Sequence, residues 1–353
     1  MIQRTTRLGE RELVQKLAAS FLRSPSQRNA LYQSDAELID LATTDHTLAV
    51  TTDSLTEEIE SGLYSDPYLI GWMTVMANAS DLAAVGARPL GLLVNETLPK
   101  EASDIFIESL QRGINEASRA IGIPILGGDT NRGATLRMSA TAIGTVTGLA
   151  LLTRVGCRPG EFLYASGKLG LGNCFAASVF GYSETDVPFK PLARIEEGQL
   201  LLRFASCCMD TSDGFLNTLD ELKILNGCGF SITASPTSYL SSQVYQIPPT
   251  AVKPWMMLAG PHGEYELVFT IPRSNHEEFL TAASEISWNP LLIGEACEDP
   301  DIVLQLDDNS VTLDTSQIRN FVYDSSASVS AFVKTLWQIE ERIHSSHRGI
   351  TKC

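Results

Sequence analysis

The sequence predicts a protein of two domains that mixes helices and strands, of the α/β or α+β class. The chain has 353 residues, which is long for one ordinary core and suits two domains. Hydrophobic residues make up 44% and charged residues 19%, an ordinary globular balance. Segments with helical and strand periodicity alternate along the chain, which is typical of these classes.

The first domain is expected at residues 1–150 and begins with apolar residues at helical spacing. A long buried helix is expected from Pro67 to Gly86, because proline suits a first helical turn and glycine a helix end. The other elements alternate: a helix at 8–22, strands at 36–42, 47–53 and 88–99, a helix at 103–122, and strands at 123–130 and 137–148.

The second domain is expected at residues 151–345, followed by a tail at 346–353. A strand at 161–166 enters the glycine-rich turn "GKLGLGN", which opens a helix. The segment "CCMDTSDGFLNTLDELKILNG" is predicted to be a strand, an acidic turn and a helix. Residues 325–345 are predicted to form a final amphipathic helix.

Charge and cysteine content restrict the partners and the compartment. The net charge of −16 argues against a nucleic-acid surface and suits a site that gathers divalent cations, although acidity can also serve solubility alone. Seven cysteines without a CxxC pair suggest reduced thiols in a cytoplasmic protein. No segment resembles a signal peptide or a membrane span, so no membrane partner is expected.

Aspartates recur beside apolar segments, at strand ends and helix starts. A buried carboxylate without a partner costs several kcal/mol, so such groups are usually paired or metal-bound. Each one alone could be a helix N-cap, but their number favours a shared Mg²⁺ site, since Mg²⁺ prefers carboxylate oxygens. The aspartates concerned are Asp35, Asp53, Asp81, Asp129, Asp210 and Asp213.

Glycine-rich turns could supply the phosphate half of such a site. In "GKLGLGN", Gly167, Gly170 and Gly172 lie between a strand and a helix, where backbone amides can receive phosphate oxygens. The segment "GGD" at 127–129 lets the backbone come close to a ligand beside a carboxylate. Together with the acids, these turns predict Mg²⁺-assisted handling of a polyphosphate.

Five segments of the chain occur in an order that is found in one enzyme family: "TTDSL", "SDPYLIGWMTVMANASDLAAVGARPLGLL", "LGGDTNRG", "LTRVGCRPGEFLYASG" and "MDTSDGF". Over residues 8–325 the chain resembles thiamine-monophosphate kinases, which share a superfamily with aminoimidazole ribonucleotide synthetase, selenophosphate synthetase and a hydrogenase maturation factor. The resemblance implies an α+β fold in which an N-terminal mixed α/β domain forms a barrel across a homodimer. It also implies a C-terminal α/β domain and ATP in the cleft between the domains.

The resemblance also implies roles for single residues. Arg154 would neutralise charge on the transferred phosphoryl group, acting with Asp53, Asp129 and Asp210 as the catalytic set. ATP contacts would come from Gly128, Asp129, Arg154 and Ser212. The implied Mg²⁺ ligands are Asp35, Thr51, Thr52, Asp53, Asp81, Asp129 and Asp210, with Asp213 as an additional one.

The chain departs from the family pattern on the side that would face the acceptor. Ser34 stands where the family has the first aspartate of Gly-Asp-Asp, and Glu60 stands where it has a substrate-contacting histidine. In "PHGEYEL", Gly263 and Glu264 replace glutamate and aspartate. Tyr323 remains from a C-terminal motif whose His-Phe is absent. Glu60, Glu264 and Tyr323 are therefore expected to line an altered acceptor pocket.

The carboxylate of Glu60 would favour an amine-bearing acceptor, although Glu57, Glu58 and Glu60 could equally form a solvated loop. The function expected first is an ATP- and Mg²⁺-dependent phosphotransferase that acts on a small molecule. The alternatives are an ATP-dependent ligase, cyclase or dehydratase that activates an amide or carboxyl oxygen, and a non-catalytic nucleotide-binding homologue.

Overall fold

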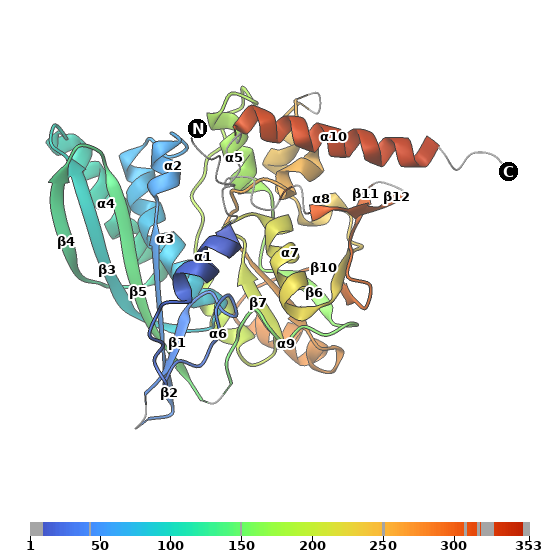
Figure 1. Ribbon diagram of the computed structural model, residues 1–353, viewed down its shortest axis with the longest axis horizontal. Coiled ribbons are helices and arrows are strands. Elements are labelled where there is room, and N and C mark those ends of the chain that lie inside the picture. Colours follow the sequence, from blue (N-terminus) through green and yellow to red (C-terminus); the bar gives the residue numbers. More distant parts are fainter. Residues whose placement is uncertain are drawn as a thin grey trace, which may run out of the picture.

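A computed structural model shows two lobes, each built around one sheet (Figure 1). It describes residues 10–41, 44–148, 150–248, 251–306, 309–315, 318 and 328–348. The predicted α+β class is confirmed, because helices and mixed sheets make up both lobes. Among the described helices, none is both long enough and apolar enough to cross a membrane.

The N-terminal sheet has five strands in the order β1-β2-β5-β3-β4. Its neighbours are antiparallel except for β3 and β4, which are parallel and joined by a helix, as parallel strands require. The strands are β1 (Glu37–Asp40), β2 (His46–Ser54), β3 (Arg88–Pro99), β4 (Ile125–Gly133) and β5 (Arg137–Thr147).

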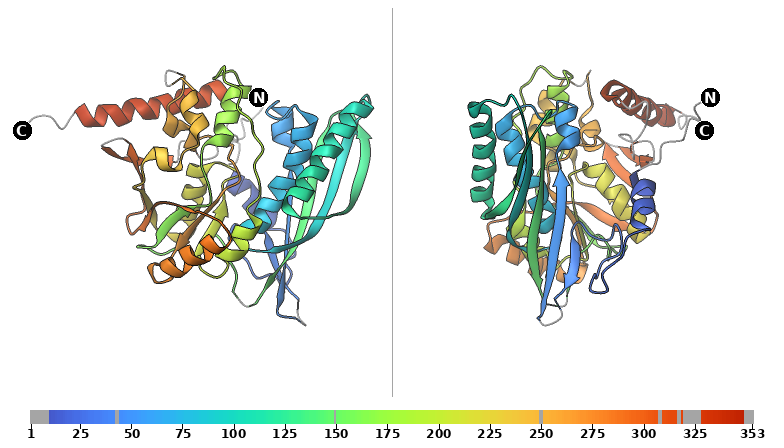
Figure 2. Two further views of the ribbon diagram at one scale, coloured as in Figure 1. Left: turned by 180° about the vertical axis from the view of Figure 1, so that it is seen from behind. Right: turned by 60° about the vertical axis from the view of Figure 1, so that its left-hand side comes forward.

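Helices α3 (Pro67–Ala84) and α4 (Asp104–Ile121) cover the face of this sheet that is turned toward the other lobe (Figure 2). The two helices approach closely at glycines. A Cβ atom at Gly71 would lie 2.1 Å from Leu110 O, and one at Gly113 would lie 2.1 Å from Tyr68 O. Side chains at these positions would therefore force the helices apart.

The C-terminal sheet has seven strands in the order β12-β11-β8-β10-β6-β9-β7. Its strands are β6 (Phe162–Ala165), β7 (Cys207–Asp210), β8 (Gly229–Ile232), β9 (Leu267–Ile271), β10 (Leu291–Cys297), β11 (Ile302–Leu306) and β12 (Asn309–Leu313). The α-helices outside α3 and α4 are α1 (Glu10–Ala18), α2 (Thr56–Glu60), α5 (Leu171–Val179), α6 (Ile195–Leu201), α7 (Phe215–Asn226), α8 (Pro236–Tyr239), α9 (His276–Glu285) and α10 (Val329–Arg348). Short 3₁₀ helices are η1 (Ser242–Gln246), η2 (Pro254–Leu258) and η3 (Arg273–Asn275).

The lobes meet where α3 packs against β7 and α6. Gly198 of α6 allows this contact, because a Cβ atom there would lie 2.1 Å from Ala83 O of α3. The end of β7 and the C-terminal part of α3 are thereby held next to β2. This junction positions the candidate site.

Candidate metal and phosphate site

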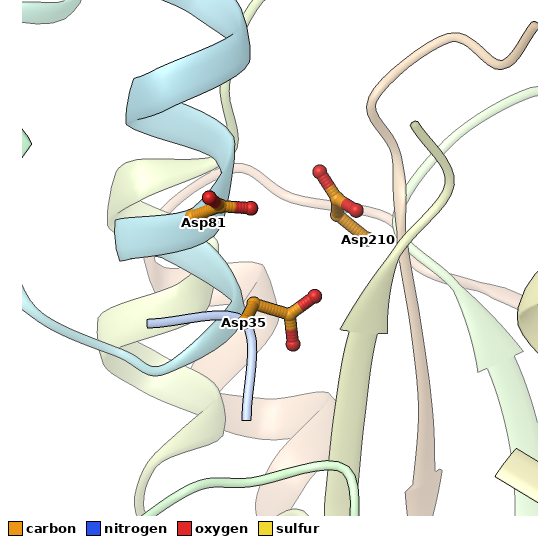
Figure 3. Close-up of side chains that lie close together, drawn as sticks. All are labelled: Asp35, Asp81 and Asp210. Carbon is orange, nitrogen blue, oxygen red and sulfur yellow. The ribbon is translucent and has the colours of Figure 1, made fainter. Parts of the chain in front are cut away.

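Three carboxylates from three separate segments converge at the junction of the lobes. Asp35 precedes β1, Asp81 lies on α3, and Asp210 is the last residue of β7. One oxygen of each carboxylate lies within 4.8 Å of one oxygen of each of the other two, and Figure 3 shows the three side chains gathered at this junction. We call these three residues the acid cluster.

Hydroxyl groups and one arginine hold the acid cluster in place. Thr51 Oγ1 donates to Asp81 Oδ2 at 2.5 Å, and Arg154 Nη2 contacts Asp35 Oδ1 at 2.9 Å. Asp210 accepts from two serines: Ser80 Oγ to Oδ2 at 2.5 Å and Ser212 Oγ to Oδ1 at 2.8 Å.

Burial and mutual repulsion make the cluster unfavourable without a cation. The pKa of Asp81 is raised well above its ordinary value, because burial removes hydration and Asp53, Asp210 and Asp35 add negative charge. Burial, with the charge of Asp35, raises the pKa of Asp210 to about 7 despite the hydrogen bonds from the serines. The pKa of Asp53 is also raised by loss of hydration and by Asp35, although its side chain still reaches solvent.

The donor set suits a hard divalent cation. Its atoms are carboxylate and hydroxyl oxygens, which Mg²⁺ prefers, and no soft ligand takes part. Within the described part of the chain, the buried atoms Asp35 Oδ2 and Arg154 Nε have no hydrogen-bond partner. Unpaired buried polar atoms are costly. A metal ion would satisfy the carboxylate oxygen of Asp35, and a phosphate oxygen would accept from Arg154 Nε.

The structure brings together Asp35, Asp81 and Asp210, and places Thr51, Ser212 and Arg154 in contact with them. Asp53 lies on the same face of β2 as Thr51, two residues along the strand. Thr52 points to the other face, where its hydroxyl donates to Ala140 O at 2.8 Å. The geometry therefore does not bring Thr52 to the acid cluster.

Asp129 lies on β4, away from the acid cluster. The strand register pairs Asp129 with Asn95, Asn95 with Ser139, and Ser139 with Ser54. Asp129 is thus level with the end of β2 but three strands away, a distance of about 14 Å at the usual strand spacing. Gly128 has a packing reason to be glycine, since a Cβ atom there would lie 1.7 Å from Val94 O.

The glycine-rich turn before α5 already holds a carboxyl group of the protein itself. Glu264 is buried, and its Oε2 accepts from the backbone N–H groups of Gly170 at 2.8 Å and Gly172 at 3.3 Å. The expectation that these amides are open to phosphate is therefore wrong, because the carboxyl group of Glu264 occupies them. Glu264, which was expected to line the pocket of the acceptor substrate, therefore has hydrogen-bond partners within the protein.

A cavity of about 470 Å³ lies among α2, α5, η2 and α10. Glu58 of α2 lines this cavity, while Glu60 is exposed at the end of the same helix. Asp213, in the turn before α7, is close enough to Glu58 to raise its pKa by its charge. Sequence reasoning chose Glu60 because it stands where the family has a substrate-contacting histidine, whereas the acids of α2 that line this cavity are Glu57 and Glu58. Tyr323 lies outside the described residues.

Comparisons with known proteins agree with the resemblance. Residues 33–146 match the family model described as AIR synthase related protein, N-terminal domain. The thiamine-monophosphate kinase of Pyrococcus abyssi is 31% identical over 238 residues, which cover 65% of this chain and 74% of that protein. The thiamine-monophosphate kinase of Escherichia coli strain K12 is 29% identical over 286 residues, which cover 78% and 87%.

Solved structures share the fold. The structure of AaThiL complexed with AMPPCP and TMP has a TM-score of 0.71 at 21% identity and covers 88% of this chain and 99% of that chain. The E. coli hydrogenase maturation protein HypE has a TM-score of 0.65 at 23% identity and covers 86% and 97%. The fold, the order of motifs and the identity over three quarters of the Pyrococcus protein agree, and the chain belongs to the thiamine-monophosphate kinase family of AIR synthase-related proteins.

Proposed function

We propose that this protein is an ATP- and Mg²⁺-dependent phosphotransferase that resembles thiamine-monophosphate kinase and phosphorylates a small molecule. The acid cluster with Arg154 beside it carries this proposal. Phosphoryl transfer requires positioning and charge neutralisation rather than a protein nucleophile, and this set of groups offers both. Its relatives include kinases of this type, and AaThiL binds AMPPCP and TMP.

Asp35, Asp81 and Asp210 would hold Mg²⁺, with Thr51, Asp53 and Ser212 close by. Bound there, the metal would neutralise phosphate oxygens as charge develops on them. Arg154 would keep one nitrogen on Asp35 while its unpaired Nε donates to a phosphate oxygen. The acceptor would enter from the cavity lined by Glu58, whose carboxyl group is close enough to Asp53 to feel its charge.

We further propose that the protein acts as a homodimer and that Asp129 serves the site of a second copy. Two observations support this. Asp129 lies about 14 Å along the sheet from its own β2. The sheet face away from α3 and α4 exposes apolar side chains that a second sheet could cover: Leu90 is 47% exposed, Leu93 41% and Leu126 55%.

Phosphorus NMR of the purified protein with Mg²⁺-ATP, with and without thiamine monophosphate, tests the function. We expect ADP together with a new phosphorylated product when a suitable acceptor is present, and loss of both signals in Asp53→Asn. Thiamine diphosphate would identify the family acceptor, whereas ADP formed only with other amine-bearing molecules would support an altered pocket. Failure to bind or consume ATP with any acceptor would refute the proposal.

The second candidate is an ATP-dependent dehydratase or ligase, favoured by the fold shared with HypE. In that case phosphate would be attached to an amide or carboxyl oxygen and then expelled. The same spectrum separates the two, because the second candidate releases inorganic phosphate with ADP and leaves no stable phosphorylated product.

A further inference from the structure

The cavity among α2, α5, η2 and α10 is large and mainly apolar. Its volume of about 470 Å³ lies within the usual range for small-molecule sites and far exceeds the space of one buried water. Apolar side chains from α5, η2, α10 and Phe180, which follows α5, form most of its wall, including Met256 and Phe332. A packed core would not keep such a space empty, since the lining atoms lose contacts.

The polar groups of the cavity are few. Glu58 Oε2 is buried and has no hydrogen-bond partner among the described residues. Burial raises the pKa of Glu58 to about 7, and the charges of Glu57, Asp53 and Asp213 add to the rise. Burial lowers the pKa of His262 to about 4, so its ring is neutral at physiological pH, and its Nε2 lies 3.3 Å from the hydroxyl of Tyr64.

These groups define what the cavity can bind. The unpaired oxygen of Glu58 requires a donor, which an N–H group supplies. Among the lining residues that the structure describes there are Glu57 and Glu58 but no lysine or arginine. An anionic group at this end of a ligand would therefore lose its hydration without gaining a partner.

The C-terminal helix α10 forms one side of the cavity. Val329, Phe332, Val333 and Leu336 line it at the spacing of a single helical face. Two tryptophans fix the helix in this position: Trp255 Nε1 donates to Glu340 Oε2 at 2.6 Å, and Trp337 Nε1 donates to Ala251 O at 3.2 Å.

We propose that this cavity binds the apolar body of the acceptor, that an amine or other N–H donor of the acceptor pairs with Glu58, and that the inner face of α10 determines which acceptor fits. This inference rests on the proposed function, because it assigns the cavity to the acceptor of the same reaction. Glu58 lies close enough to Asp53 to feel its charge, and Asp53 lies on the same strand face as Thr51, which contacts the acid cluster. The ligand class is a ring-bearing or branched apolar molecule that is cationic or neutral at the Glu58 end.

Three probes of similar size test the ligand class: naphthylmethylamine, naphthylmethanol and naphthoate. Calorimetric titration of the full chain, without ATP, should show affinity in the order amine, alcohol, acid. Glu58→Gln should weaken the amine at least tenfold and change the alcohol little, because a charge-assisted hydrogen bond is lost. Glu60→Gln is the matched control, since Glu60 is exposed at the end of the same helix and is not among the described lining residues, and it should leave the order and the affinities nearly unchanged.

Two variants test the role of α10. Phe332→Ala should weaken the amine and the alcohol alike, while Lys334→Ala, on the exposed side of the helix, should not. If Phe332→Ala fails to fold, Val329→Trp replaces it: Val329 is 37% exposed and tolerates a larger side chain, which should obstruct the cavity.

The outcomes separate this inference from the proposed function. Equal binding of all three probes, or amine binding that is indifferent to Glu58→Gln, overturns the inference even if ATP is consumed. The expected probe order with no ATP consumption under any acceptor supports the cavity as an amine site. That second result refutes the kinase proposal on which the acceptor role depends.

Discussion

The acid cluster and the cavity lined by α10 each lack a binding partner, but of opposite kinds. The acid cluster has too much charge for its burial, as the raised pKa values of Asp81 and Asp210 show. The cavity is an unfilled space of about 470 Å³, and among the described residues the buried oxygen Oε2 of Glu58 on its wall has no hydrogen-bond partner. A cation would complete the first region and an organic molecule the second, so the two regions suit two different ligands of one reaction.

The largest expected effect comes from Asp81→Asn, which tests the difference between the two regions directly. Asp81→Asn should lower ATP turnover about a thousandfold or more, because a metal ligand is lost. In EDTA the same variant should be more stable than wild type by about 1–2 kcal/mol, because a buried like charge is removed while the amide oxygen still accepts from Thr51. Phe332→Ala should do the reverse and destabilise by about 3 kcal/mol, since it enlarges the cavity.

Urea denaturation with and without Mg²⁺ measures both effects. Wild type should gain stability from Mg²⁺, and Asp81→Asn should gain little. Asp45→Asn, in an exposed turn away from the junction, serves as the control and should behave as wild type. A less stable Asp81→Asn protein in EDTA would mean that the acid cluster is not under charge strain.

A mixture of two inactive variants tests whether one chain alone supplies all the aspartates of its metal and phosphate site. Asp81→Asn and Asp129→Asn subunits should each be inactive alone, but their co-expressed mixture should recover about a quarter of wild-type turnover. Random pairing makes about half of the dimers mixed, and one of the two sites in each mixed dimer would then carry both native aspartates.

The control mixture is Asp81→Asn with Asp210→Asn. Both of these residues belong to one chain's acid cluster, so every site in the mixture lacks one of them and no activity should return. If the first mixture also stays inactive, Asp129 serves its own chain and must reach the nucleotide at a point remote from the cluster.

The two regions also differ in how far sequence could predict them. Asp35, Asp81 and Asp210 stood out because each carboxylate adjoins apolar residues, and such groups need partners wherever the chain folds. Thr52 was added by resemblance, and the alternation of side chains along β2 turns it away from the cluster. The strand elements were predictable from periodicity, whereas the place of β4 at the sheet edge depends on its pairing with β3.

The cavity was not predictable, because its wall comes from segments far apart in sequence. Glu58, Met256, His262 and Phe332 carry no shared pattern, and only folding brings them together. The final helix itself was expected at 325–345 and is observed at Val329–Arg348, so its existence followed from periodicity and its packing did not. Charge is local information in a sequence, while enclosed volume is a property of the folded chain.

The smallest expected effect concerns Glu264, a buried acid that already accepts hydrogen bonds from the backbone of its own chain. Burial raises its pKa from 4.5 to about 8, with Glu266 adding to the rise, even though the amides of Gly172 and Gly170 favour the ionised form. The folded protein therefore holds this proton more tightly than the unfolded chain does. Between about pH 4.5 and pH 8, the free energy of unfolding should fall as pH rises.

Glu264→Gln should remove this slope, because glutamine stays neutral and its amide oxygen can still accept from Gly170. Near pH 5 the two proteins should be about equally stable, and above pH 8 the variant should be more stable by on the order of a few kcal/mol. Urea denaturation across this range measures the difference, with Glu298→Gln, an exposed acid, as the control. A wild type that is more stable than the variant at high pH would show that the helix N-terminus stabilises the carboxylate more than burial opposes it. Glu264 would then be an ionised buried carboxylate that backbone N–H groups stabilise, as a cation would stabilise the acid cluster.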